Sequence, residues 1–201
     1  MPSIDLDFLS NLHDDFKNYS NFVETGTYLG DTTFCVEPHF DNIYTIEIKK
    51  QFYEDAKNKY SGNKIKFFNG DSSQVLKEIL PTLQGKSIIF LDGHWSANNT
   101  GRGEKDCPLY EEVSNIIKLH EDEAIIIIDD VRLFGKGPNQ MGENYDTCNW
   151  EDINKGDILN IVQDRFTNIY FRDSLITTRK HGEVLNSMDR LIIHLKRKDL
   201  Y

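Results

Sequence analysis

The sequence has few cysteines and no long apolar run. Its three cysteines, Cys35, Cys107 and Cys148, are odd in number and widely spaced, which is typical neither of a disulfide framework nor of a zinc site. We therefore expect reduced thiols, as in a cytoplasmic protein. The apolar runs Ile88–Leu91 and Ala124–Ile128 are too short to cross a bilayer, so no membrane partner is expected.

Basic charge is also scarce. The 201 residues include 33 acidic and 23 basic side chains, for a formal net charge of −10. Nucleic-acid backbones are bound by clustered Lys and Arg, and the basic cluster at 196–198 is short and terminal, so no nucleic-acid partner is expected. The acidic first residues lack the basic and apolar regions of a secretory leader, which favours a cytoplasmic location. The length and the 38% hydrophobic content predict one folded domain over residues 1–201.

Short apolar runs alternate with segments of helical period, which predicts an α/β protein. Two of these runs, Ser87–Leu91 and Ala124–Ile128, do not alternate with polar residues and are typical of central parallel strands covered on both faces. The expected strands are Phe22–Glu24, Ile43–Glu47, Ile65–Asn69, Ser87–Asp92, Ala124–Asp130, Asn168–Phe171 and Arg190–Lys196.

Apolar residues three and four apart predict helices between these strands. Their stripes are Phe52/Ala56/Tyr60, Val75/Leu76/Ile79/Leu80 up to Pro81, Leu109/Val113/Ile116/Ile117, and Ile158/Ile161/Val162/Phe166. Residues 1–20 are expected to form a helical extension, because Phe8, Leu12 and Phe16 are spaced four residues apart. Such an extension could cap the sheet or form a contact between the two chains of a homodimer. Two long polar connections, 93–107 and 131–150, follow the central strands and are typical of binding loops.

A glycine loop follows the first expected strand. Gly26 and Gly30, with Thr27 between them, fit a tight turn that brings backbone close to a ligand. Glu24 at the end of the strand would repel a pyrophosphate and attract an ammonium group. Tyr28 also interrupts a full G-x-G-x-x-G pattern, so the loop argues against NAD and FAD.

Acidic residues end the next two expected strands. Glu47 lies 21 residues after Gly26, the spacing of an acid that accepts both ribose hydroxyls, although it could instead cap the next helix. Asp71 could accept a hydrogen bond from an adenine amine, with Ser72 beginning the following helix. The alternative for this pair is an ordinary helix N-cap.

Taken in order, E-x-G-x-x-x-G, an acid after strand two, G-D-S and L-D-G-H resemble a class I S-adenosylmethionine-dependent methyltransferase over Phe22–Arg132. The resemblance implies a Rossmann-like fold: a mostly parallel seven-stranded sheet with its last strand inserted antiparallel and helices on both faces. It also implies that Glu24 and the Gly26–Gly30 loop hold the methionine part of the cofactor, Glu47 the ribose, and Asp71 with Ser72 the adenine.

Three aspartates are expected at neighbouring strand ends. Asp92, Asp129 and Asp130 would repel one another there unless a cation lay between them, and oxygen ligands suit Mg²⁺, with Mn²⁺ or Ca²⁺ as alternatives. The pattern is similar to metal-dependent sugar O-methyltransferases of the macrocin O-methyltransferase type, in which such aspartates bind the ion. The alternatives are a helix cap, a salt bridge, or contact of Asp92 with the cofactor's ammonium group.

His94, two residues after Asp92, is the candidate general base for an acceptor hydroxyl, with Asp92 and Asp129 as catalytic partners; a solvated loop histidine is the alternative. The polar loop at 98–107 resembles a loop of glycan-modifying methyltransferases, including domains from large DNA viruses of algae. We expect an O-methyltransferase acting on a sugar or small hydroxylated acceptor. A metal-dependent hydrolase using the aspartates and a nonenzymatic nucleoside-binding domain are the competing interpretations.

Overall fold

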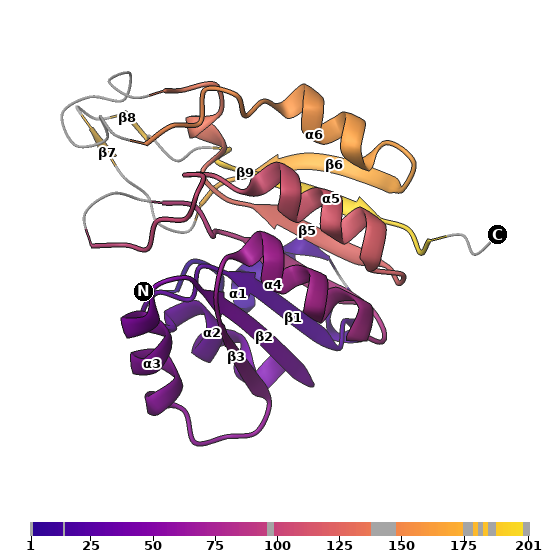
Figure 1. Ribbon diagram of the computed structural model, residues 1–201. Helices are drawn as coiled ribbons and strands as arrows, with labels where there is room; N and C mark the ends of the chain where they lie inside the picture. Colours follow the sequence, from indigo (N-terminus) through magenta and orange to yellow (C-terminus); the bar gives the residue numbers. More distant parts are fainter. Residues whose placement is uncertain are drawn as a thin grey trace.

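The structure is a computed structural model that describes residues 2–13, 15–95, 99–137, 148–174, 179–180, 183–184 and 188–198. Its centre is a seven-stranded sheet with the strand order β3-β2-β1-β4-β5-β9-β6 (Figure 1). The strands are β1 (Asn21–Thr25), β2 (Asn42–Glu47), β3 (Ile65–Asn69), β4 (Ser87–Leu91), β5 (Ala124–Ile128), β6 (Phe166–Arg172) and β9 (Arg190–Leu195). A separate two-stranded sheet, β7 (Arg179–Lys180) and β8 (Glu183–Val184), was not expected from the sequence.

Strands β1 to β5 run parallel, and β9 is antiparallel to both of its neighbours, β5 and β6. The predicted sheet, mostly parallel with its last strand inserted antiparallel, is therefore confirmed. The register of the strands aligns the carboxyl ends of β1, β2 and β4, because Thr25 of β1 pairs with Ile46 of β2 and with Leu91 of β4. The loops that follow these strands consequently meet at one edge of the sheet.

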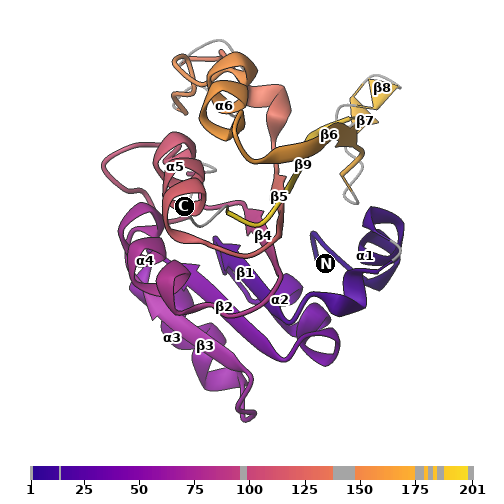
Figure 2. The ribbon, with the colours of Figure 1, turned by 90° about the vertical axis from the view of Figure 1, so that its right-hand side faces the viewer.

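Helices cover both faces of the sheet, as expected. Figure 2 shows α4, α5 and α6 on one side and α1 and α2 on the other. The helices are α1 (Leu6–Leu12), α2 (Asp31–Val36), α3 (Lys50–Lys59), α4 (Ser72–Ile79), α5 (Leu109–Leu119) and α6 (Lys155–Val162). None of the helices in the described part of the chain has the length and apolar character needed to span a membrane.

Two details of the expected helices are wrong. Phe166 was expected on the stripe of α6, but the helix ends at Val162 and Phe166 begins β6 with 43% of its surface exposed. Phe16 was expected in the first helix, but α1 ends at Leu12, and Phe16 is buried in a separate 3-10 turn. In both cases a turn intervenes, so a spacing of four no longer keeps residues on one helical face.

The N-terminal extension is a cap on the sheet. The hydroxyl of Tyr170 in β6 donates to the carbonyl of Leu12 at 3.0 Å. The buried residues Phe8 and Leu9 of α1 belong to one apolar cluster with Ile127 of β5 and Ile192 of β9. This packing accounts for the apolar face of α1 within the chain, and the homodimer stays a prediction.

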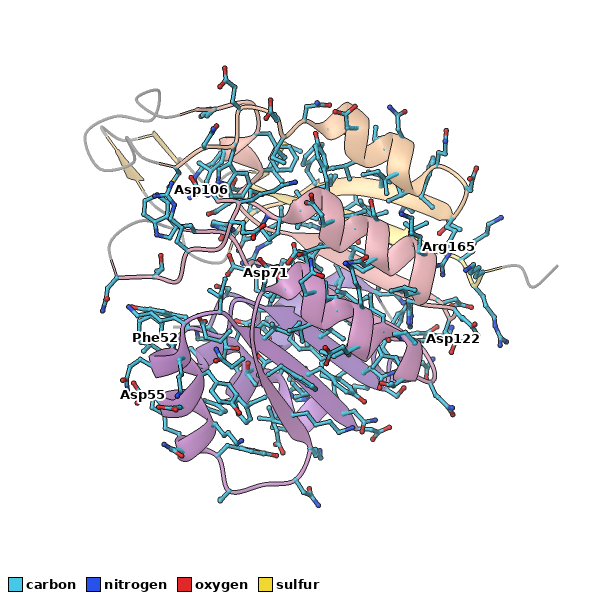
Figure 3. All side chains as sticks on the ribbon, viewed as in Figure 1. Phe52, Asp55, Asp71, Asp106, Asp122 and Arg165 are labelled. Atoms are coloured by element: carbon cyan, nitrogen blue, oxygen red, sulfur yellow. The ribbon has the colours of Figure 1, made fainter. Side chains whose placement is uncertain are left out.

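The central strand β5 is buried at all five positions. Its alternating isoleucines divide between the two cores, with Ile126 and Ile128 facing α5 and α6 and Ile125 and Ile127 facing α1. At one end of the sheet the Arg165 guanidinium donates to the carbonyls of His120, Asp122 and Lys196. Figure 3 shows Arg165 and Asp122 at this end and Asp71 and Phe52 toward the other, where the strand-end loops gather.

Candidate cofactor and acceptor site

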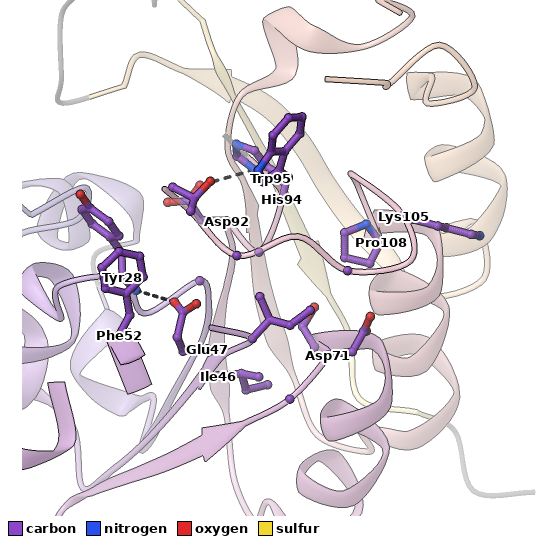
Figure 4. Close-up of a pocket in the computed structure, with 18 residues that line it drawn as sticks. Tyr28, Ile46, Glu47, Phe52, Asp71, Asp92, His94, Trp95, Lys105 and Pro108 are labelled. Atoms are coloured by element: carbon purple, nitrogen blue, oxygen red, sulfur yellow. Dashed lines mark hydrogen bonds and ion pairs between the residues drawn. The ribbon is translucent and has the colours of Figure 1, made fainter. Parts of the chain in front are cut away.

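A cavity of about 290 Å³ lies at the edge of the sheet where the strand-end loops meet (Figure 4). It draws its lining from the segments after β1, β2, β3 and β4 and from the loop that leads to α5. The lining includes the predicted residues Gly26, Glu47, Asp71, Ser72, Asp92 and His94. Thus six candidates spread over 69 positions of sequence share one cavity.

The glycine loop requires glycine at Gly26. Gly26 adopts φ +86°, and a Cβ built there would lie 2.3 Å from the backbone oxygen of Asp92. Gly30 adopts φ +83° as the N-cap of α2 but does not line the cavity. Thr27 is also outside the lining, with its hydroxyl 2.6 Å from that of Thr45. The loop therefore presents Gly26 and the next exposed residue, Tyr28, to the cavity.

Glu47 is held rigidly at the end of β2. Its Oε2 accepts from the backbone N–H of Tyr28 at 2.8 Å, and its Oε1 accepts from that of Lys49 at 2.8 Å. The N-cap of α3 is Lys49, so Glu47 is not that helix's capping residue. Each carboxylate oxygen keeps a further lone pair. These lone pairs can accept the two hydroxyls of a ribose.

Asp71 and Ser72 lie at the start of α4 as expected, and their contact with an adenine stays a prediction. Asp71 is the N-cap of α4, and its Oδ1 accepts from the backbone N–H of Ser73 at 2.9 Å. Both Asp71 and Ser72 also line the cavity. The cap fixes the side chain, and it leaves Oδ2 opposite Gly103, where an added Cβ would come within 3.1 Å.

Glu24 lies beneath the cavity instead of on its surface. It is 2% exposed and accepts hydrogen bonds from the hydroxyls of Thr45, at 2.7 Å, and Thr33. Burial raises the pKa of Glu24 to about 7, while the two threonine hydrogen bonds oppose that shift. Its predicted contact with an ammonium group stays a prediction, and Asp92 is the acid that reaches the lining at this end.

His94 lies between two carboxylates. Its Nε2 is 2.8 Å from Asp130 Oδ2 and its Nδ1 is 3.6 Å from Asp92 Oδ1. Burial lowers the pKa of His94, but Asp130 and Asp92 outweigh burial and raise it to about 9. Burial, followed by the charge of Asp129, holds the pKa of Asp92 well above its usual range. His94 is thus an imidazolium at neutral pH in this arrangement.

The predicted metal ligands do not converge as expected. Among the described residues, the carboxylates that come together are Asp129, Asp130 and Asp189, with ligand atoms within 4.8 Å of one another, and Asp92 is outside this group. Asp189, directly before β9, was not among the residues predicted from the sequence.

Cations of the chain already balance these carboxylates. Arg190 binds Asp129 through two contacts of 3.2 Å, and Arg132 pairs with both Asp130 and Asp189. With His94 on Asp130, three carboxylates face two guanidinium groups and one imidazolium. A divalent cation would meet no uncompensated negative charge there. The donor set therefore does not fit a metal ion.

The loop after β4 forms a roof over the cavity. Lys49 donates from Nζ to the backbone and side-chain oxygens of Asn99. A Cβ at Gly101 would lie 2.2 Å from Ile48 Cγ2, so the backbone of the loop rests directly on the segment after β2. Trp95 lines the cavity, and the Arg102 guanidinium lies 4.1 Å from the centre of its ring. Of the two predicted binding loops, residues 96–98 and 138–147 lie outside the described part of the chain.

No protein-family model matches the chain, and no curated protein matches it. Solved structures do. The N-methyltransferase NodS from Bradyrhizobium japonicum has a TM-score of 0.55 and 12% identity, over 95% of this chain and 93% of that one. An S-adenosylmethionine-dependent methyltransferase from Clostridium acetobutylicum has a TM-score of 0.54 and 13% identity, over 98% and 93%. This chain has the Rossmann-like methyltransferase fold.

A third protein with the methyltransferase fold, SMU.1697c from Streptococcus mutans, was solved in complex with SAH; its TM-score is 0.54 and its identity 15%, over 94% of each chain. Similarity at this level of identity concerns the fold alone, and function must be argued from the site.

One buried acidic residue near the cavity, Glu112, was not predicted from the sequence. Glu112 of α5 is 2% exposed directly behind the cavity. The sequence does contain a feature that could have identified it, because Glu112 lies among Leu109, Val113 and Ile116 on the buried face of α5. A carboxyl group at a core position of an amphipathic helix indicates a specific polar partner.

Proposed function

We propose that this chain transfers a methyl group from S-adenosylmethionine to a hydroxyl of a sugar or another small polyhydroxylated acceptor. The observation that carries the proposal is the lining of one cavity by Gly26, Glu47, Asp71 and Asp92 in the order in which β1, β2, β3 and β4 end. Gly26 and Asp92 match an amino-acid tail, Glu47 a ribose and Asp71 a base.

In this proposal Glu47 accepts the ribose hydroxyls, because both of its oxygens are already oriented by backbone N–H groups. Asp71 and Ser72 receive the adenine, and Asp92 receives the ammonium group of the methionine part. The backbone at Gly26 lies against that tail. The sulfonium of S-adenosylmethionine supplies the methyl group, and the chain's task is to align an acceptor oxygen with the methyl carbon.

His94 is proposed to take the proton of the acceptor hydroxyl. Asp130 holds Nε2, so Nδ1 is the nitrogen available as a base once His94 is neutral. As the oxygen–methyl bond forms, the sulfur–methyl bond breaks and the hydroxyl proton moves to Nδ1. No metal ion is needed for this step, in keeping with the balanced charge of the aspartates.

A hydroxylated acceptor is supported by the polar roof of the cavity. Thr100 and Lys105 line it beside backbone at Gly101 and Gly103. Such a surface offers donors and acceptors for several hydroxyl groups, with Trp95 as an apolar wall. A cytoplasmic location remains part of the proposal.

Titration calorimetry with S-adenosylmethionine and with SAH tests the cofactor assignment. We expect both to bind, and absence of binding to either would contradict the proposal. Transfer of a radiolabelled methyl group to a panel of mono- and oligosaccharides then tests the acceptor. Binding with transfer only to amines would refute the hydroxyl acceptor, and binding without transfer to any compound would favour the nonenzymatic nucleoside-binding domain.

A further inference from the structure

Glu112 occupies a position that joins three segments of the cavity. The side-chain hydroxyls of Thr25, at the end of β1, and Ser72, at the start of α4, lie close enough to its carboxyl group to influence its pKa. Its Oε1 lies beside Gly93, where a Cβ would come within 3.1 Å. Thr25 and Gly93 flank the backbone N–H of Asp92, which donates to Thr25 Oγ1 at 3.2 Å. One carboxyl thus touches the ends of β1 and β4 and the beginning of α4.

One oxygen of the same carboxyl group lacks a hydrogen-bond partner among the described residues. Among the described residues, Oε1 of Glu112 has no hydrogen-bond partner, and neither has Nε1 of Trp150. Both residues are 2% exposed, so bulk water does not satisfy these atoms. A buried polar atom without a partner costs about 1–3 kcal/mol, and such atoms in native proteins are commonly completed by an ordered water.

A small chamber lies where such a water is needed. Its volume is about 10 Å³, and Glu112 and Trp150 both line it, together with His94. That volume is about one water-sized sphere. The rings of His94 and Trp150 pack in a T-shaped arrangement with their centres 4.7 Å apart, and His94 lines the chamber, so the chamber adjoins the proposed base.

We propose that Glu112 is a positioning residue for the cofactor, and that one buried water joins its Oε1 to the indole N–H of Trp150. Glu112 does not line the cavity. It acts by holding Thr25, Ser72 and Gly93 in register, so that Asp92 and the first turn of α4 keep their places. Burial raises the pKa of Glu112 to about 7, while the side chains of Ser72 and Thr25 oppose that shift. A water can donate to a carboxylate or accept from a protonated carboxyl, so it suits both states.

The water is tested without any ligand. A high-resolution crystal structure of the unliganded protein should show one ordered water within hydrogen-bond distance of Glu112 Oε1 and Trp150 Nε1. Trp150→Phe, which removes only the N–H and the outer part of the indole, should displace or disorder that water. A dry chamber in the wild-type protein would overturn this half of the inference.

The positioning role rests on the proposed binding of S-adenosylmethionine and is measured with SAH by calorimetry. Glu112→Leu should weaken SAH binding about tenfold through the loss of the polar contacts with Thr25 and Ser72, whereas Glu112→Gln, which keeps an acceptor oxygen, should recover most of the affinity. Thr25→Val removes one partner of the carboxyl, and with it an acceptor of the Asp92 N–H, without altering α5; it should weaken binding severalfold, which covers the case in which Glu112→Leu does not fold. Glu78→Leu, a matched change at an exposed site of α4, is the control.

Equal SAH affinity in Thr25→Val, Glu112→Leu and wild type, at equal thermal stability, would overturn the positioning role. Failure of the wild-type protein to bind SAH would instead count against the proposed function, and the crystallographic water would then decide the structural half of the inference alone. The two failures are therefore distinguishable.

Discussion

At the scale of single residues, Glu47 is the most direct test of the cofactor site. Glu47→Ala should weaken SAH binding by about 1–3 kcal/mol, because two ribose hydroxyls would lose their acceptor. Calorimetry measures the change. Glu54→Ala, an exposed glutamate of α3 paired with Lys50, is the matched control and should bind SAH like the wild type. Unchanged affinity in Glu47→Ala would refute the ribose assignment.

His94 makes a second residue-scale prediction, on pH. Its pKa is raised to about 9 against the effect of burial, chiefly by Asp130, so methyl transfer should increase as the pH rises toward 9 and the imidazole becomes neutral. Asp130→Asn removes that anion and should move the His94 pKa, and the limb of the rate profile, to lower pH. NMR titration of the imidazole C–H signals measures the pKa without knowledge of the acceptor.

Asp164→Asn, at an exposed position in the turn after α6, is the control for this pH experiment. It should leave both the His94 pKa and the rate profile unchanged. A His94 pKa that stays in place in Asp130→Asn would show that another group holds the proton.

Asp129 is the residue for which the metal and salt-bridge interpretations differ most. Its partner Arg190 is completely buried and lies over the ring of Phe8, so Asp129→Asn would leave a buried guanidinium without its counter-charge. We expect the free energy of unfolding to fall by about 3–5 kcal/mol in urea denaturation. The double variant Asp129→Leu/Arg190→Met should recover much of the loss. A stable Asp129→Asn protein that has lost only turnover would support the metal interpretation instead.

At the scale of elements, α1 is an integral part of the fold and not an appendage. Leu9 is completely buried against the face of the sheet that carries Ile127 and Ile192. Leu9→Ala should therefore reduce the free energy of unfolding by about 2–5 kcal/mol. Leu6→Ala in the same helix, at a position 41% exposed, should change it by less than about 0.5 kcal/mol. If thermal and urea denaturation showed equally small losses of stability for Leu9→Ala and Leu6→Ala, α1 would not be needed to cover the sheet.

The elements also show where periodicity is informative. The unbroken apolar runs of β4 and β5 identified central strands within two residues of their ends, because burial on both faces admits little else. The small β7–β8 sheet gave no signal, since strands of two residues have no measurable period. The stripe through Phe166 misled because a spacing of four is also met by chance across a turn.

At the scale of the whole molecule, the distribution of charge bears on the metal question. The chain carries a net charge of −10, yet the carboxylates of Asp129, Asp130 and Asp189 are compensated locally by Arg132, Arg190 and His94. We therefore expect that millimolar Mg²⁺ changes neither the melting temperature nor the affinity for SAH, and that EDTA does not reduce methyl transfer. Stabilisation by Mg²⁺ at constant ionic strength, together with faster transfer, would restore the metal interpretation.

The sequence by itself determined the α/β architecture, the strand ends and the polar residues at those ends that line the cavity. Turn glycines and strand-terminal acids are local features, and parallel strands necessarily bring their ends to one edge. Tertiary structure alone decided what each acid faces. Glu24 lies under the cavity against two threonines, and Asp189, directly before β9, joins Asp129 although the two residues are some sixty positions apart in sequence. Partners of that kind depend on packing between distant segments, and the energy of a buried charge depends on those partners more than on its neighbours in sequence.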